Sequence, residues 1–203
     1  MNRSPSQSAN AGRSASGVRR VQAAGLSRGG AIALMSALAL VVLVLDLVSK
    51  NWAEDALMDV ESRPLLGDLL QLRLIYNSGA AWGMGEGITP VITCVQILIC
   101  VAAILFVVRG VRSRIWVVAL GLIIGGALGN IHDRLLREPA PFRGEVVDFL
   151  QLPHWPIFNI ADIGVTTGAI LIVLLGVLGT APDPSAAGAE PADGAAEHEE
   201  PSA

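Results

Sequence analysis

The sequence predicts an all-α polytopic membrane protein: four transmembrane helices, with a small extracytoplasmic loop containing β structure between the first two. Of the 203 residues, 52% are hydrophobic and only 16% are charged, a composition typical of membrane proteins. Four apolar stretches approach the roughly 20 residues that a helix needs to cross about 30 Å of hydrocarbon. They run approximately over residues 30–48, 88–108, 115–131 and 158–178.

The first of these stretches follows several arginines, as the apolar part of a signal peptide would. It is too long for one, and no small-residue cleavage site follows it, so we expect a retained helix. The two ends of the chain differ from this core, because residues 1–28 are rich in Ser, Ala, Gly and Arg, and residues 181–203 in Ala, Pro and acids. We expect two disordered cytoplasmic tails flanking a membrane domain at residues 29–180.

Basic residues predict the orientation, because short loops rich in Lys and Arg stay on the cytoplasmic side. Arginines precede the first helix and crowd the short loop between the second and third: Arg3, Arg13, Arg19, Arg20, Arg28, Arg109, Arg112 and Arg114. Both termini are therefore expected inside, and loops 51–87 and 132–157 outside. No further basic cluster suggests a nucleic-acid partner.

Two local patterns bear on the first outer loop and on metal binding. The segment "LLQLRLIYN", residues 69–77, alternates partly between apolar and polar residues and predicts a short strand in the first outer loop. Cys94 and Cys100 fall inside the second helix as packing residues. No spacing of Cys and His is typical of a metal site, and we expect neither a metal nor another cofactor.

Polar residues of three helices are predicted to lie at one depth. Asp46 and Lys50 are four residues apart near the outer end of the first helix, a spacing that favours an ion pair. Asp133 follows Arg114 by a distance of about 28 Å along the third helix, which brings it close to the outer boundary. Asp162 lies in the first turns of the fourth helix, which begins at the same surface. Ionisable groups gathered in this way indicate a functional site.

Small residues predict that the third and fourth helices pack closely. Glycines recur at intervals of four in both, a spacing that lets helix backbones approach: Gly121, Gly125 and Gly129, then Gly164 and Gly168. Such packing is expected to bring Asp133 and Asp162 together.

Two carboxylates a few ångströms apart do not both ionise, so Asp133 and Asp162 would share one proton near neutral pH. In aspartic proteases one such carboxylate takes a proton from water while its protonated partner polarises the scissile carbonyl. An alternative stays open from spacing alone: Asp133 pairs with Arg134 or another base, and Asp162 caps a helix.

Five segments resemble the successive sequence boxes of the bacterial lipoprotein signal peptidases, the signal peptidase II family. Each is weak alone, but all five occur in the family's order across nearly all of residues 30–178. They are "DLVSK" at 46–50, "YNSGAAWGM" at 76–84, "GGALGNIHDRL" at 125–135, "VVDFL" at 146–150 and "FNIADIGVTTGAI" at 158–170.

The resemblance implies an aspartic endopeptidase of the bacterial cytoplasmic membrane, with its active site near the outer leaflet. It would remove the signal peptide of prolipoproteins on the N-terminal side of a diacylglyceryl-modified cysteine. Asp133 and Asp162 match the boxes assigned to the catalytic pair, and water would attack without a covalent intermediate. The implied partners are lipid-modified prolipoproteins and membrane lipid, and a monomer is expected.

The same boxes suggest supporting residues around the pair. Asn130 and Asn159 precede the two aspartates by one turn, where they would hydrogen-bond the carboxylates or the substrate backbone, or tie helices together. Arg134 is expected at the interface, holding a lipid phosphate or an acidic loop residue such as Asp148, for which a structural role is expected.

The resemblance also suggests roles for two further pairs of residues. Asn77 and Gly79 belong to the first outer loop, which the resemblance implies cradles the substrate. Asp46 and Lys50 either stabilise the outer helix ends or touch the substrate.

Three departures from the family pattern leave substrate preference open: Leu47 where the family usually has Gln, Trp82 where Phe is common, and His132 at a position more often aliphatic. His132 neighbours Asp133 in sequence, so on a helix it points about 100° away and is expected to take no part in the chemistry.

Two other classes of membrane protein fit less well. A small transporter or proton channel would show internal duplication or polar groups near mid-membrane. A scaffold protein would explain the glycines but not two acids at one level. A presenilin-like protease would share the acid pair, but its GxGD signature is missing.

Overall fold

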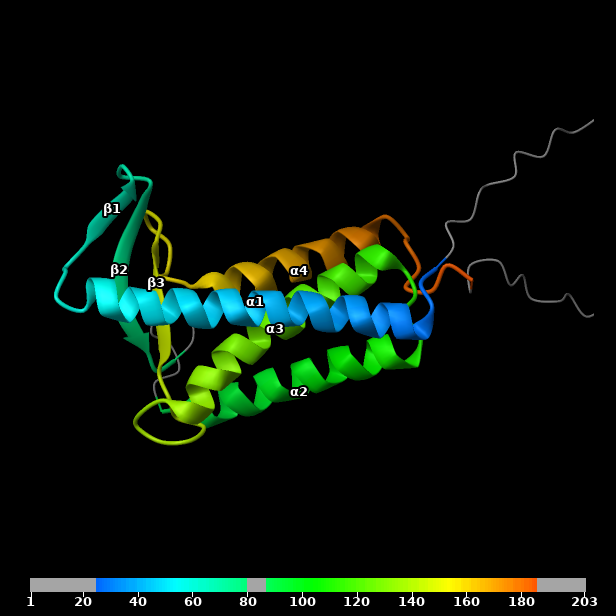
Figure 1. Cartoon of the computed structure of the whole chain (residues 1–203), viewed down its shortest axis with the longest axis horizontal. Helices are drawn as coiled ribbons and strands as arrows, with labels where there is room; N and C mark the ends of the chain where they lie inside the picture. Colours follow the sequence, from blue (N-terminus) through cyan, green and yellow to red (C-terminus); the bar gives the residue numbers. More distant parts are fainter. Residues whose placement is uncertain (1–24, 80–86, 186–203) are drawn as a thin grey trace, which may run out of the picture.

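Four helices lie side by side, and a three-stranded sheet covers one end of the bundle (Figure 1). The computed structural model describes residues 25–79 and 87–185. Trp82 and most of both expected tails lie outside these ranges. In chain order the elements are α1 (Arg28–Leu57), β1 (Arg63–Leu66), β2 (Leu70–Asn77), α2 (Thr89–Arg109), α3 (Arg114–Leu136), β3 (Val146–Gln151) and α4 (Ile160–Val177).

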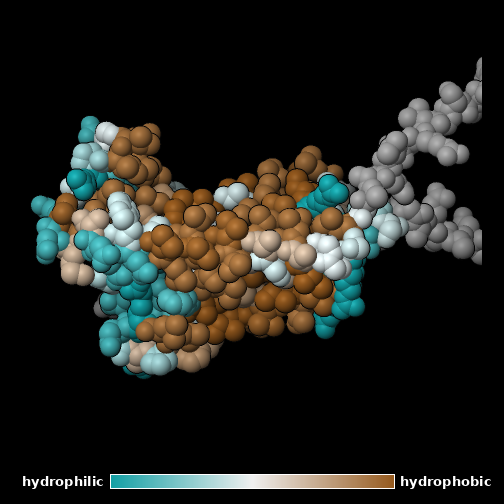
Figure 2. All heavy atoms as spheres, viewed as in Figure 1, coloured by the Kyte–Doolittle hydropathy of each residue, from teal (hydrophilic) through white to brown (hydrophobic). Residues whose placement is uncertain are grey.

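The four predicted spans are confirmed, since each of these helices is long and apolar enough to cross a membrane. Figure 2 shows hydrophobic residues covering the middle of the bundle, with hydrophilic residues gathered at the two ends. This distribution is the one that a bilayer imposes on a protein spanning it, because lipid tails surround the middle and water the ends.

Two helices extend past their predicted ends. The apolar stretches end near residues 48 and 131, but α1 continues to Leu57 and α3 to Leu136. In α1 the extension carries Ala53 and Leu57 four residues apart, and both are buried against the sheet. The apolar stretches therefore mark only part of these two helices.

The sheet joins the loop between α1 and α2 to the loop between α3 and α4. Strand β2 confirms the strand expected in the first loop, and it pairs antiparallel with β1 on one side and β3 on the other. Strand β3 comes from the second loop and was not predicted, because its residues are buried on both faces and show no alternation. Its register sets Asp148 opposite Ile75 of β2 and Val146 opposite Asn77, so residues of the two loops meet at one edge of the bundle.

Helix α3 lies at the centre of the packing. The close approach expected from its glycines is confirmed, but the glycines of α3 contact two helices, α1 as well as α4. A Cβ added at Gly125 would lie 2.7 Å from the Ala39 oxygen of α1. Gly126, which the four-residue spacing does not include, faces the backbone of Ala161 in α4 instead. Gly168 of α4 in turn lies against the Ala119 oxygen of α3. Small residues therefore pack α3 against α1 and α4 at once.

We expect Gly126→Leu to destabilise the protein by about 1–3 kcal/mol or more, because its side chain meets the α4 backbone, which has no room to move. The control is Gly176→Leu, because a Cβ there has no atom within 4 Å. Thermal unfolding in detergent micelles should show a lower midpoint for Gly126→Leu alone. Equal losses in both variants would contradict the packing described.

Candidate active site

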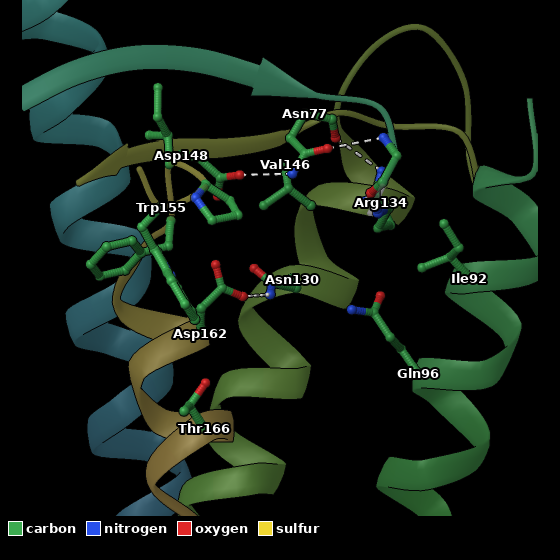
Figure 3. A pocket seen from close by; sticks show the side chains of 14 residues that line it. Asn77, Ile92, Gln96, Asn130, Arg134, Val146, Asp148, Trp155, Asp162 and Thr166 are labelled. Atoms are coloured by element: carbon green, nitrogen blue, oxygen red, sulfur yellow. Dashed lines mark hydrogen bonds between the residues drawn. The ribbon is translucent and has the colours of Figure 1, made fainter. Parts of the chain in front are cut away.

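A cavity of about 450 Å³ opens between α2, α3 and α4, below the sheet (Figure 3). Its walls combine carboxylates, amides and a guanidinium with an apolar rim from the segment before α4. The lining residues are Asn77, Gly79, Ile92, Gln96, Asn130, Arg134, Val146, Asp148, Trp155, Pro156, Ile157, Phe158, Asp162 and Thr166. Of the nine residues predicted for the site, five therefore line the cavity: Asn77, Gly79, Asn130, Arg134 and Asp162.

Asp162 is aimed into this cavity by the start of α4. It forms a capping box with Asn159, whose side chain accepts the Asp162 N–H at 3.0 Å while the Asp162 Oδ2 accepts the Asn159 N–H at 3.2 Å. The other oxygen, Oδ1, accepts a hydrogen bond of 2.9 Å from the amide of Asn130. Asp162 therefore caps the helix and still presents its carboxyl to the cavity (Figure 3).

Asp148 is the second carboxyl in the cavity, and it comes from β3. It is 1% exposed, and its oxygens accept hydrogen bonds from the side chains of Asn159 at 2.6 Å and Asn77 at 2.8 Å. Burial, followed by the negative charge of Asp162, raises the pKa of Asp148 from its ordinary value to about 7. The two acids therefore influence each other electrostatically, and near neutral pH Asp148 is partly protonated.

Asp133 lies outside the cavity lining, within α3, and is fully buried. Its carboxylate lies 2.8 Å from the Lys50 ammonium and 2.9 Å from Arg137 Nε, and the backbone N–H of Val147 donates to Oδ2 at 3.3 Å. The cavity thus brings Asp162 together with Asp148, where sequence reasoning expected Asp133. The alternative left open above, in which Asp133 pairs with a base, matches this geometry, although the bases are Lys50 and Arg137.

Lys50 is fully buried, and its ammonium has three partners. Asp46 lies at 2.7 Å, which confirms the predicted ion pair, Asp133 lies at 2.8 Å, and the Asn130 Oδ1 accepts a hydrogen bond at 3.1 Å. The ammonium thus lies between two carboxylates and one amide oxygen. Because Lys50 holds the oxygen of the Asn130 amide, the nitrogen of that amide points at Asp162.

Asp46 also connects α1 to α4. One of its carboxylate oxygens accepts the backbone N–H of Ala161 at 2.8 Å, in the first turn of α4. Asp46 and Lys50 do not line the cavity, and neither does Asn159. Their contacts fit the helix-stabilising role expected as one alternative for Asp46 and Lys50.

Arg134 holds the end of the loop between α1 and α2. Its guanidinium donates to the backbone oxygen of Asn77 at 3.1 Å, to that of Gly144 at 3.2 Å, and to that of Gly79. The Asn77 side chain turns back to accept the Gly79 N–H at 3.0 Å. The expected ion pair of Arg134 with Asp148 is therefore replaced by hydrogen bonds to carbonyl groups, which fix the loop against the cavity.

Sequence reasoning underestimated Asp148 and overlooked Arg137 and Gln96. The signal for Asp148 was a lone acid between apolar residues in "VVDFL", which is typical of a buried strand carrying a functional group. His132, expected to be a bystander, does not line the cavity, although its Nδ1 lies 3.3 Å from the Asp133 carboxylate.

The sequence profile of the family described as "Signal peptidase (SPase) II" matches residues 38–178. The chain is 44% identical over 146 residues to the lipoprotein signal peptidase of Mycobacterium leprae, covering 72% of each. It is 42% identical over 160 residues to that of Rhodococcus jostii, covering 77% of this chain and 79% of the relative.

The fold is similar to that of a bacterial membrane enzyme solved by the in meso method at 2.3 Å resolution. The TM-score is 0.65 at 31% identity, covering 78% of this chain and 93% of that one. A second such structure, at 1.9 Å, gives a TM-score of 0.63 at 31% identity, with 78% and 98% covered. The chain thus belongs to the signal peptidase II family, the aspartic peptidase family A8, and is a multi-pass membrane protein.

Proposed function

We propose that the chain is a lipoprotein signal peptidase that cuts prolipoproteins on the N-terminal side of a diacylglyceryl-modified cysteine, with Asp148 and Asp162 activating water. The observation that carries this proposal is the presence of two buried carboxyls in one cavity at the end of a membrane bundle. Membership of the signal peptidase II family supports the reaction.

Asp148 takes the role that the sequence boxes suggested for Asp133. A general base must reach the proton that it removes, directly or through one water. The Asp133 carboxylate is enclosed by Lys50, Arg137 and a backbone N–H, whereas Asp148 and Asp162 both line the cavity. An ionised Asp133 neutralised by two cations is also a weak base. Its role is therefore to position other groups.

The mechanism begins with one proton on the pair. Asp148, with its raised pKa, holds that proton in a hydrogen bond to the scissile carbonyl oxygen and transfers it to that oxygen as water attacks. Asp162, which accepts hydrogen bonds from Asn130 and the Asn159 backbone, is ionised and takes a proton from water as the water oxygen bonds to the carbonyl carbon. The resulting tetrahedral intermediate then breaks its C–N bond. Asp162 gives its proton to the leaving nitrogen of the cysteine, and Asp148 recovers its own.

Asn159 keeps the two carboxyls in fixed relation. Its side chain donates to Asp148 while its backbone N–H donates to Asp162, so one residue contacts both acids. The same side-chain nitrogen lies 3.2 Å from Asn130 Oδ1, which also accepts from Lys50. Preorganised donors of this kind reduce the rearrangement that the reaction requires.

We infer the membrane orientation from the arginines at the end of the bundle opposite the sheet. Arg109, Arg112 and Arg114 lie in or beside the α2–α3 connection, which favours a cytoplasmic location for that end and for both termini. The sheet and the cavity then lie near the outer leaflet, where Trp155 on the cavity rim is at the level that Trp prefers. The signal peptide helix would lie between α2 and α4, and the lipid chains of the cysteine among the acyl chains. All the groups invoked belong to one chain, which supports a monomer.

The dyad is tested with Asp148→Asn and Asp162→Asn, each assayed on a lipid-modified prolipoprotein. We expect each change to lower the cleavage rate roughly 10³-fold in protein that still folds, because each removes a proton-transfer group while keeping the size and shape of the side chain. Asp133→Asn serves as the matched comparison. It should lower the unfolding temperature, because Lys50 loses a buried partner, and folded protein should still cleave. Full activity in Asp148→Asn would refute the assignment.

The pH dependence of cleavage follows from the proton on Asp148. Because its pKa is raised to about 7, raising the pH above 7 removes the proton that polarises the substrate carbonyl. We expect kcat/KM to fall above pH 7, approaching about tenfold per pH unit. The same proton makes the stability of the folded protein depend on pH. The native state binds this proton more tightly than the unfolded chain, so the free energy of unfolding should decrease as the pH rises towards 7. In Asp148→Asn this contribution to the pH dependence should be absent. A rate that stays constant from pH 7 to 9 would contradict this account.

The orientation is tested by labelling single cysteines in a Cys94→Ala, Cys100→Ala background. Ser62→Cys lies in the outer loop and Ser185→Cys beyond α4, and both side chains are exposed. A membrane-impermeant maleimide should label Ser62→Cys on intact cells and Ser185→Cys only after the membrane is permeabilised. The reverse pattern would overturn the orientation and with it the location of the site.

A further inference from the structure

Gln96 is a polar residue of α2 that neither the dyad nor its supporting hydrogen bonds use. It lines the cavity, and Figure 3 shows its side chain reaching from α2 towards the cavity centre, with Asp162 and Asn130 on the far side. Its Oε1 is buried and has no hydrogen-bond partner among the described residues, and its amide nitrogen, which carries the N–H donors, faces the cavity centre (Figure 3). A polar group within a membrane helix is costly unless something satisfies it. The amide is therefore available for a ligand.

The depth of Gln96 suggests which part of a substrate it meets. It is seven residues, or about 10 Å, into α2 from the end of the helix that lies beside the sheet. Across the cavity, Thr166 lies one turn deeper along α4 than Asp162, with its side chain in the same lining. Gln96 and Thr166 thus stand on opposite walls, both attached to their helices deeper in the bundle than Asp162, and the Gln96 amide reaches from there back towards the dyad (Figure 3).

A signal peptide that enters from the cytoplasmic side must change conformation at this level. Its apolar segment crosses lipid as a helix, because a lipid-exposed backbone has to satisfy its own hydrogen bonds. A helical peptide bond is enclosed by its neighbouring turns, so the helix must end before the dyad for the scissile carbonyl to reach it. The last four carbonyl groups of any helix have no partner within that helix. Those carbonyls would fall just deeper than the scissile bond.

We propose that the Gln96 amide, with the Thr166 hydroxyl opposite, binds the free carbonyl groups at the C-terminal end of the signal peptide helix. This inference rests on the proposed function and on the orientation given there. Both groups are hydrogen-bond donors, which these carbonyls lack in lipid. By satisfying the end of the helix, the two residues fix where it stops and so which peptide bond reaches Asp148 and Asp162. Gln96 is thus a residue for substrate positioning and cleavage-site selection.

The test combines enzyme variants with changes in the substrate backbone. The substrates are synthetic lipopeptides carrying the diacylglyceryl cysteine, each with one ester replacing an amide at a bond two to five residues before the scissile bond. An ester carbonyl is a weaker acceptor than an amide carbonyl. Wild-type enzyme should lose activity at one or two particular ester positions.

Gln96→Leu should lower kcat/KM for the all-amide substrate roughly tenfold, mainly through KM, the size expected for one lost hydrogen bond. It should also lose the position-specific sensitivity to the ester. Gln151→Leu is the matched control, because Gln151 lies on β3 outside this cavity. It should behave as wild type. Thr166→Val, which keeps the side-chain shape, should show a smaller loss with the same pattern.

A Gln96→Leu enzyme that cleaves as fast as wild type would overturn the inference. A Gln96→Leu enzyme with the predicted loss of kcat/KM that is still sensitive to the same ester positions would also overturn it. If Gln96→Leu does not fold, Thr166→Val and the wild-type ester series decide the question, and a wild-type enzyme indifferent to every ester position overturns the inference. Failure of the wild-type enzyme to cleave the all-amide lipopeptide would instead refute the proposed function.

Discussion

The buried ammonium of Lys50 is the interaction on which the rest of this site depends. It has no access to water, so its charge must be balanced within the protein, and Asp46 and Asp133 do so from α1 and α3. The third N–H goes to Asn130, which leaves the nitrogen of that amide directed at Asp162. One buried cation therefore joins α1 to α3. It also orients the Asn130 amide, which donates a hydrogen bond to the proposed base, Asp162. Removing this cation would leave the buried carboxylate of Asp46 without a cation and that of Asp133 with Arg137 alone.

The same interaction explains why four aspartates in one small region have different roles. Asp46 and Asp133 lie against cations, which neutralise their charge. Among the described residues, no Lys, Arg or His lies within ion-pair distance of Asp148 or Asp162, whose partners are amides and backbone N–H groups. Neutral donors hold a carboxyl in place without fixing its charge. Only the second pair is free to exchange a proton in a cavity, as aspartic catalysis requires.

The sequence predicted the helices, the strand at β2 and five of the residues that line the cavity, because apolar length, alternation and motif order are local signals. It did not predict which acid pairs with Asp162. Spacing placed Asp133 at the right depth, but depth along a helix does not say which way a side chain points. The direction of the Asp133 side chain depends on its contact with Lys50, which lies 83 residues earlier in the chain. The position of Asp148 depends on the register between β2 and β3. Gln96 was overlooked for a similar reason, since one amide in an apolar helix has no pattern around it.

The most direct measurement is a structure of the protein with a non-cleavable lipopeptide in which a hydroxyl-bearing carbon replaces the scissile carbonyl carbon. That hydroxyl imitates the tetrahedral intermediate, so it should lie within hydrogen-bond distance of both Asp148 and Asp162. Asp133 should remain bound to Lys50 and Arg137, as it is without substrate. A hydroxyl bound by Asp133, with Asp148 away from the ligand, would contradict the account.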